Sequence, residues 1–133
     1  MLRDVDTQYL EGLGLTFSTY EQDATSLLVI EGYPLPAGYS PSGVDLLIQI
    51  PSAYPDAALD MWWTYPHVVF ELNGVEPTNA NVRLAFSGFT PDPSRQWQRF
   101  SRHPQWRAGV DDLRSFLTAL RSTMGSEAKQ VAA

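Results

Sequence analysis

The sequence predicts an α+β domain in which a meander of antiparallel strands is followed by a helix. Four short segments in the first half carry strand-like apolar patterns, and turn-forming residues separate them. One segment near the end instead repeats its apolar residues at helical spacing. The chain has 133 residues, of which 44% are hydrophobic, so it is long enough to form one packed core.

The first expected element is a short amphipathic helix. Between Asp4 and Leu13 the apolar residues fall near one face at helical spacing. Gly12 or Gly14 is expected to end this helix, because glycine is common just after the last helical turn. We interpret the helix as a cap that docks on the sheet.

Four strands are expected next, and they form the meander. The first alternates apolar and polar residues, the second is more continuously apolar, and the third places its apolar residues on one face. Their ranges are 15–20, 26–31, 44–50 and 59–65. Residues 32–43 contain three prolines and three glycines, which predicts an ordered loop between the second and third strands.

The chain beyond the fourth strand is less regular. Pro66 has no backbone donor, so it breaks the strand or lies on an edge, and residues 67–72 are expected to resume it. Residues 73–95 form a long loop in which 82–86 fits a short strand. A loop of this length inside a small domain is usually functional or mobile.

A helix is predicted from Val110 to Met124. Its apolar residues recur at helical spacing, acidic residues stand at its start, and Gly125 suits its end. The domain therefore spans residues 1–125, and residues 126–133 are expected to be a disordered or frayed tail.

Charge and composition exclude several classes of protein. The net charge of −6 argues against a nucleic-acid partner, because phosphates require a basic surface. No apolar run is long enough to cross a bilayer, so we expect no membrane partner and a cytoplasmic location. The chain has no cysteine and only two histidines, so neither a metal site nor another cofactor is expected.

The chemically richest segment is residues 97–106. Ser101, Arg102 and His103 are consecutive, and bulky aromatic residues flank them. We expect these aromatic side chains to anchor an irregular segment between sheet and helix, where functional residues are common. They are Trp97, Phe100 and Trp106.

Several separated motifs resemble one known family. They are Leu35-Pro36-Ala37-Gly38-Tyr39, Asp45-Leu46-Leu47-Ile48, Tyr54-Pro55-Asp56-Ala57, Asp60-Met61, the segment Trp97 to His103, Trp106-Arg107 and Gly109-Val110-Asp111-Asp112-Leu113. In this order they are similar to bacterial ubiquitin-conjugating-enzyme-like proteins of prokaryotic family E. The resemblance spans about residues 10–120.

This resemblance implies the UBC/RWD-like fold of conjugating enzymes: an N-terminal helix, a four-stranded antiparallel meander, an extended loop with the active site, and a helix. It also implies three partners, namely a ubiquitin-like modifier protein, its activating enzyme and a target protein that supplies an amine. In the wider family a tryptophan stands before this helix, as Trp106 does here. A His-Pro-Asn triplet and a cysteine precede that tryptophan in the wider family, and this chain has neither. A thioester cycle is therefore excluded for this polypeptide.

Without cysteine, the covalent intermediate of such a protein would be an oxyester. Ser101 is the candidate nucleophile and His103 the candidate base, because a serine hydroxyl needs a base within hydrogen-bond reach. In an extended segment these two side chains share one side and Arg102 lies opposite. In a turn, Arg102 could instead hold the oxyanion or the modifier's tail.

Alternatives remain at this stage. Ser94 and Thr90 are weaker candidate nucleophiles, because no histidine is close to either in sequence. Asp111 or Asp112 could orient His103, although we favour a helix-capping role for them. The chain could also be a catalytically inactive binding module that scaffolds the modifier or the activating enzyme. An unrelated serine hydrolase is disfavoured, because the glycine-rich nucleophile turn is absent.

Overall fold

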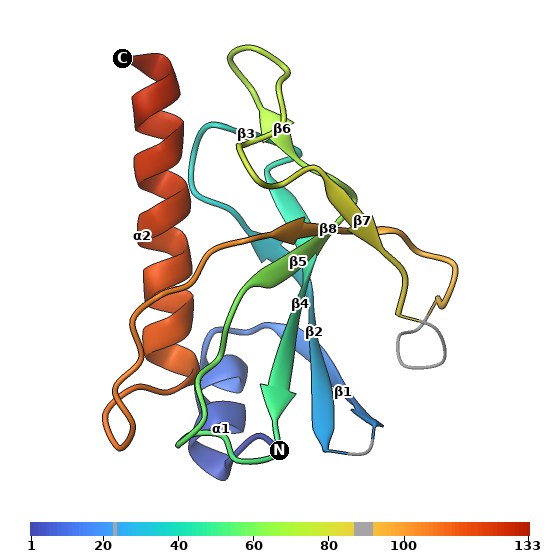
Figure 1. The fold of residues 1–133 in the computed structure, drawn as a ribbon, viewed down its shortest axis with the longest axis vertical. Coiled ribbons are helices and arrows are strands. Elements are labelled where there is room, and N and C mark those ends of the chain that lie inside the picture. The colour runs from blue at the N-terminus through green and yellow to red at the C-terminus, as the bar shows by residue number, and fades with distance from the viewer. Residues whose placement is uncertain (23, 87–91) are drawn as a thin grey trace.

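The computed structural model of the chain describes residues 1–22, 24–86 and 92–133 (Figure 1). Two helices and eight strands are described within these ranges. In chain order they are α1 (Asp4–Gly12), β1 (Thr16–Gln22), β2 (Thr25–Pro34), β3 (Tyr39–Ser40), β4 (Gly43–Pro51), β5 (Trp62–Tyr65), β6 (Val69–Phe70), β7 (Val82–Leu84), β8 (Trp97–Phe100) and α2 (Leu113–Ala132). The predicted α+β class is confirmed, with one helix before and one after the strands of an antiparallel sheet in chain order.

The main sheet has six strands in the order β1-β2-β4-β5-β8-β7, and every neighbouring pair is antiparallel. The first four are the predicted meander. The predicted strand number is wrong, because β8 and β7 extend the sheet beyond β5. Strand β8 lies in the segment predicted to be irregular. Its side chains alternate between two buried surfaces, a pattern that the adjoining Ser-Arg-His sequence obscured.

A second, two-stranded sheet lies beyond Pro66. Val69 and Phe70 of β6 were expected to resume the fourth strand, but they pair with Tyr39 and Ser40 of β3. The pairing also places a short strand inside the predicted loop 32–43. The chain leaves β5 at Pro66, as expected for a residue without a backbone donor.

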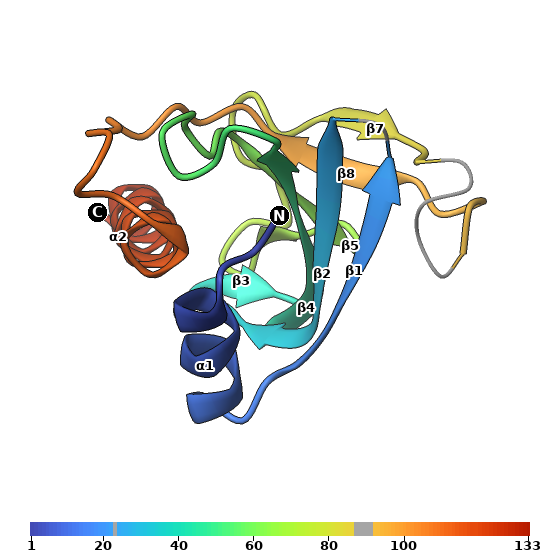
Figure 2. The ribbon, with the colours of Figure 1, turned by 90° about the horizontal axis from the view of Figure 1, so that it is seen from below.

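Both helices lie on one side of the main sheet, as Figure 2 shows. The principal core fills the space between them and the sheet, and Trp62, Phe100 and Phe116 are among its largest side chains. Trp62 stacks on Phe100 with ring centroids 5.7 Å apart. A smaller apolar cluster, centred on Trp63 and Trp97, covers the opposite face of the sheet.

Helix α2 differs from its predicted range at both ends. Val110 lies outside it and is 63% exposed, while Asp112 is the N-cap and accepts a hydrogen bond from Ser115 N. The helix continues through Gly125 to Ala132, so the frayed tail predicted for 126–133 is wrong. Its apolar stripe continues there, because Ala128 and Val131 pack against the principal core. Neither helix in the described ranges has the length and apolar character needed to cross a membrane.

Candidate functional site

The candidate site begins where β8 leaves the sheet, and Gln98 fixes the chain around that point. Gln98 is fully buried, so each polar atom of its amide needs a partner. Its oxygen accepts from Thr64 Oγ1 at 2.9 Å and from Val68 N at 2.7 Å. Its nitrogen donates to Val68 O at 3.0 Å and Ala80 O at 2.8 Å. One side chain thus ties the irregular segment after β5 to the sheet.

Ser101 directly follows β8 and is partly buried. Its backbone N–H donates to Asn79 O at 3.2 Å, which holds it beside the irregular segment. Within the described ranges, no hydrogen bond joins Ser101 Oγ to His103. The two residues are separated along the chain by Arg102 alone, and no nucleophile–base contact is formed between them.

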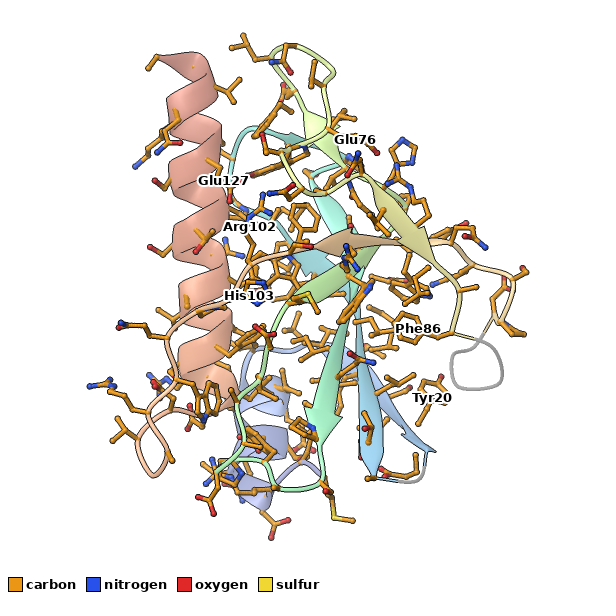
Figure 3. All side chains as sticks on the ribbon, in the orientation of Figure 1. Tyr20, Glu76, Phe86, Arg102, His103 and Glu127 are labelled. Atoms are coloured by element: carbon orange, nitrogen blue, oxygen red, sulfur yellow. The ribbon has the colours of Figure 1, made fainter. Side chains whose placement is uncertain are left out.

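Arg102 points toward α2, as Figure 3 shows together with Glu127. Its Nε and Nη2 donate to the two carboxylate oxygens of Glu127 at 2.8 and 2.6 Å. Nη2 also donates to Thr78 O at 2.8 Å, and Nη1 donates to Ser101 O at 3.2 Å. The Arg102 side chain is only 15% exposed. We call residues 101–112, which connect β8 to α2, the crossing segment. This bidentate pair fixes the crossing segment to α2, and most N–H donors of the guanidinium are used in the hydrogen bonds just described.

His103 is 65% exposed, and it pairs with a carboxylate that sequence reasoning missed. Its Nδ1 lies 2.8 Å from Asp60 Oδ1. Asp60 precedes β5, and the antiparallel pairing Trp62↔Phe100 brings the chain before β5 beside the chain after β8. Spacing along the chain does not reveal the contact between Asp60 and His103. Only a prediction that β5 pairs with β8 would have revealed it.

Two residues with left-handed backbone conformations bond to the backbone of this site. Met61 and Asn79 have φ values of 56°, in the left-handed region that bulky residues seldom adopt. Met61 N donates to Arg102 O at 3.0 Å, and Asn79 O accepts from Ser101 N. Each of these two residues is thus hydrogen-bonded directly to the backbone of Ser101 or Arg102. Uncommon backbone conformations of this kind persist only where the surrounding structure holds them in place, and they cluster at functional sites.

A cavity of about 230 Å³ adjoins the pair of Asp60 and His103. It opens at the ends of β2 and β4 and lies beside Asp60. Its lining residues are Thr25, Gln49, Pro51, Ala58, Asp60 and Met61. Asp60 therefore both contacts the imidazole and lines this cavity.

The flanking aromatic residues anchor the segment as expected. Trp97 and Phe100 are almost fully buried, on opposite faces of the sheet. Trp106 packs against the principal core, and its indole N–H donates to Pro55 O at 2.9 Å. This bond joins the crossing segment to the Tyr54-Pro55 turn.

The remaining candidates lie apart from His103. Asp112 caps α2, as we favoured, and Asp111 Oδ2 accepts from Arg107 N at 2.6 Å. The hydrogen bond from Arg107 N lowers the pKa of Asp111. Ser94 is exposed, with its hydroxyl bonded to Asp92 at 2.6 Å, and Thr90 lies outside the described residues. In the described ranges, no group of three histidine or carboxylate side chains gathers to hold a metal ion.

Comparison with known proteins identifies the family. No curated protein and no solved structure matches the chain. A family model described as Prokaryotic E2 family E matches residues 2–127, which is nearly the whole sequence. The helix–sheet–helix architecture agrees with that match, and the predicted resemblance is confirmed. The chain belongs to prokaryotic family E of the ubiquitin-conjugating-enzyme-like proteins.

Proposed function

We propose that this chain is an atypical conjugating enzyme that transfers a ubiquitin-like modifier through a serine oxyester. Membership of the family supports a conjugating-enzyme-like role in general, with a modifier and an activating enzyme as partners. The absence of cysteine excludes a thioester on this chain, so a hydroxyl would have to carry the acyl group. The target protein, its amine and the predicted cytoplasmic location remain predictions.

In the proposed reaction, Ser101 Oγ attacks the activated C-terminal carbonyl of the modifier. The group that activated the carboxyl leaves, and the serine proton passes to His103 Nε2. A target amine then attacks the ester carbon, which forms an amide and returns the hydroxyl to Ser101. The observation that carries this proposal is the placement of His103, which lies two residues after Ser101, is exposed, and has its Nδ1 held by Asp60. Rotation of the Ser101 side chain would have to complete the contact on substrate binding.

Arg102 is assigned a positioning role in this proposal rather than the direct one considered from sequence. Its guanidinium is committed to Glu127 and to two backbone oxygens. It therefore holds the backbone on which Ser101 and His103 stand.

Mass spectrometry tests the oxyester. The protein is incubated with its activating enzyme, the modifier and ATP, and a covalent adduct is sought that survives thiol reductant but not mild base. We expect the adduct on Ser101 by peptide mapping, and we expect it to disappear in Ser101→Ala. The matched control is Ser94→Ala, which removes an exposed hydroxyl that is not next to a histidine. An adduct that maps to Ser94 or Thr90 would show that the wrong hydroxyl was chosen.

The second candidate function is a catalytically inactive binding module for the modifier or the activating enzyme. The lack of a hydrogen bond between Ser101 Oγ and His103 within the described ranges favours it. The same experiment separates the two functions. Stable binding of a partner with no adduct on any hydroxyl supports the binding module and contradicts the enzyme.

A further inference from the structure

We propose that Asp60 is a positioning residue that holds neutral His103 in the tautomer with Nδ1 protonated. Nε2 is then the atom that accepts the proton during transfer. This inference rests on the proposed function for its role in transfer, while the tautomer itself can be measured independently. Asp60 was not among the residues singled out as catalytic from the sequence.

The contact fixes which ring nitrogen carries the proton. An ionised carboxylate only accepts hydrogen bonds, so the bond of 2.8 Å between His103 Nδ1 and Asp60 Oδ1 requires a proton on Nδ1. In the neutral ring, Nε2 then has a free lone pair. An imidazole without a hydrogen-bond partner has no such contact to select one tautomer. In a hydrogen-bonded imidazole, the bond made by one ring nitrogen decides whether the other nitrogen carries a proton.

Exposure alone would make this pair unremarkable, because exposed ion pairs are usually worth little and vary in geometry. Here the backbone on both sides is tied down. Met61, next to Asp60, donates its N–H to Arg102 O at 3.0 Å. Arg102, next to His103, is fixed by its bidentate pair with Glu127 on α2. Each partner is thus one residue from a fixed point, and these two points are bonded to each other.

The left-handed backbone at Met61 strengthens the argument. A φ of 56° for this bulky residue costs about 1–2 kcal/mol and needs a compensating gain. The conformation brings the Met61 N–H onto the crossing segment, and with it the preceding Asp60. Asp60 and Met61 also line the cavity of about 230 Å³, so this held backbone borders an open space next to the pair.

The chemical consequence is a base with one defined atom. His103 Nε2 accepts the proton of Ser101 Oγ as the ester forms. When the target amine displaces the ester, Nε2 returns that proton to Oγ, takes up the proton that the amine nitrogen loses, and releases it to solvent. Asp60 stays ionised throughout and stabilises the imidazolium through Nδ1–H. With the other tautomer, Nε2 would already carry a proton and could not act as the base.

The test is Asp60→Asn, which preserves shape but offers an amide N–H to Nδ1 and so favours the wrong tautomer. The first measurement is the ¹⁵N spectrum of the imidazoles in the full chain, at a pH where the rings are neutral. We expect wild-type His103 to show Nδ1–H and the variant to shift to Nε2–H. His67, which is exposed elsewhere, is an internal control whose signals should not move.

The second measurement is the rate of modifier transfer. We expect Asp60→Asn to slow it by about 100-fold or more. Binding of the modifier should be unchanged. The matched control is Asp56→Asn, an exposed carboxylate in the preceding loop, which should leave both the tautomer and the rate unaltered.

The two measurements separate the two hypotheses. A wild-type His103 that carries its proton on Nε2, or a variant with unchanged tautomer and rate, overturns the role of Asp60. If the wild-type protein forms no adduct, the oxyester function is contradicted. If Asp60→Asn still shifts the tautomer in that case, Asp60 orients the His103 ring but takes no part in transfer.

Discussion

At the scale of single residues, buried polar side chains decide how the irregular part of the chain is held. Gln98 is the clearest case, because all four of its hydrogen bonds go to buried partners and three of them reach Val68 or Ala80 outside the main sheet. A buried amide that is fully bonded specifies one arrangement of the backbone around it. The position of Ser101 and His103 therefore depends on a neighbour that takes no part in the proposed chemistry.

We predict that Gln98→Leu lowers the free energy of unfolding by about 2–4 kcal/mol. The leucine fills much of the space but leaves the backbone groups of Val68 and the oxygen of Ala80 buried without their partner. Urea unfolding followed by tryptophan fluorescence measures the change. The control Gln96→Leu, at an exposed position two residues away, should change stability by less than about 0.5 kcal/mol. Equal losses in the two variants would contradict the assigned role of Gln98.

The candidate site was only partly predictable at this scale. The consecutive Ser101, Arg102 and His103 were found from sequence because their chemistry is visible in the residue types. Asp60 and Glu127 were missed as partners, since each contact joins residues far apart along the chain and depends on strand pairing or helix docking. Arg102 was considered for binding substrate, yet the structure commits it to α2, which sequence position alone could not show.

At the scale of elements, the prediction succeeded where the hydrophobic period was clean. The first helix and the four meander strands are predictable because their apolar residues repeat at a helical or strand period or, in the second strand, form a continuous apolar run between turn residues. Strand β8 was missed because its four residues mix tryptophan, glutamine and arginine, and Gln98 is buried for its hydrogen bonds rather than for its hydrophobicity. Strands β3 and β6 have two residues each, which is too short for a period to appear.

The C-terminal part of α2 was mispredicted because Gly125 was interpreted as a stop. Glycine disfavours a helix interior by only about 1 kcal/mol relative to alanine, and tertiary contacts readily offset that cost. Here those contacts come from Glu127, which binds Arg102, and from Ala128, which packs against Gly38. Docking, rather than local propensity, keeps the last turns helical.

Gly38 provides a test of that docking. Its φ is +106°, and a Cβ built there would lie 2.8 Å from Ala128 Cβ on α2. We predict that Gly38→Ala lowers the free energy of unfolding by about 2–4 kcal/mol, through backbone strain and a clash with the helix. The comparison variant Gly74→Ala also replaces a glycine of positive φ, +69°, but has open space around its Cβ. It should cost about 1–2 kcal/mol, from strain alone.

Thermal and urea unfolding of the two glycine variants give the comparison. A further readout is amide hydrogen exchange in residues 126–132, which should increase in Gly38→Ala and stay unchanged in Gly74→Ala. Identical losses of stability, with no change in exchange at the end of α2, would show that the helix end is not docked on this loop.

At the scale of the whole molecule, buried tyrosine hydroxyls fasten α2 to the rest of the fold. Tyr54 donates to Asp6 of α1 at 2.9 Å and accepts from Leu113 N at the start of α2 at 2.8 Å. Tyr39 donates to Met124 O, further along α2, at 2.7 Å. The turn after β4 and the strand β3 thereby hold the helix at two points along its length, and α1 is joined to the same network.

These hydroxyls must stay protonated for the fold to keep its bonds. Burial raises the pKa of Tyr54, and its bond to Asp6 raises it further against the opposing bond from Leu113 N. Burial likewise raises the pKa of Tyr39, as does the nearby Glu127 carboxylate, while Arg102 opposes it.

The raised pKa values predict that stability is lost in alkaline solution. The unfolded chain releases its tyrosine protons near the ordinary pKa of about 10, whereas the folded protein keeps them to higher pH. The contribution is therefore fully present below about pH 10 and falls as pH rises above it, by about 1.4 kcal/mol per pH unit for each such tyrosine. Burial raises the pKa of Tyr33 as well, which adds to the slope.

Urea unfolding between neutral and strongly alkaline pH measures this slope, with tyrosinate absorbance reporting ionisation in each state. Tyr39→Phe and Tyr54→Phe should each be less stable at neutral pH, because each loses a buried hydrogen bond. Each should also depend less steeply on pH above 10, since one shifted tyrosine has been removed. A free energy of unfolding that stays constant well above pH 10, or tyrosinate that forms in the folded protein near pH 10, would show that these hydroxyls do not hold α2 in place.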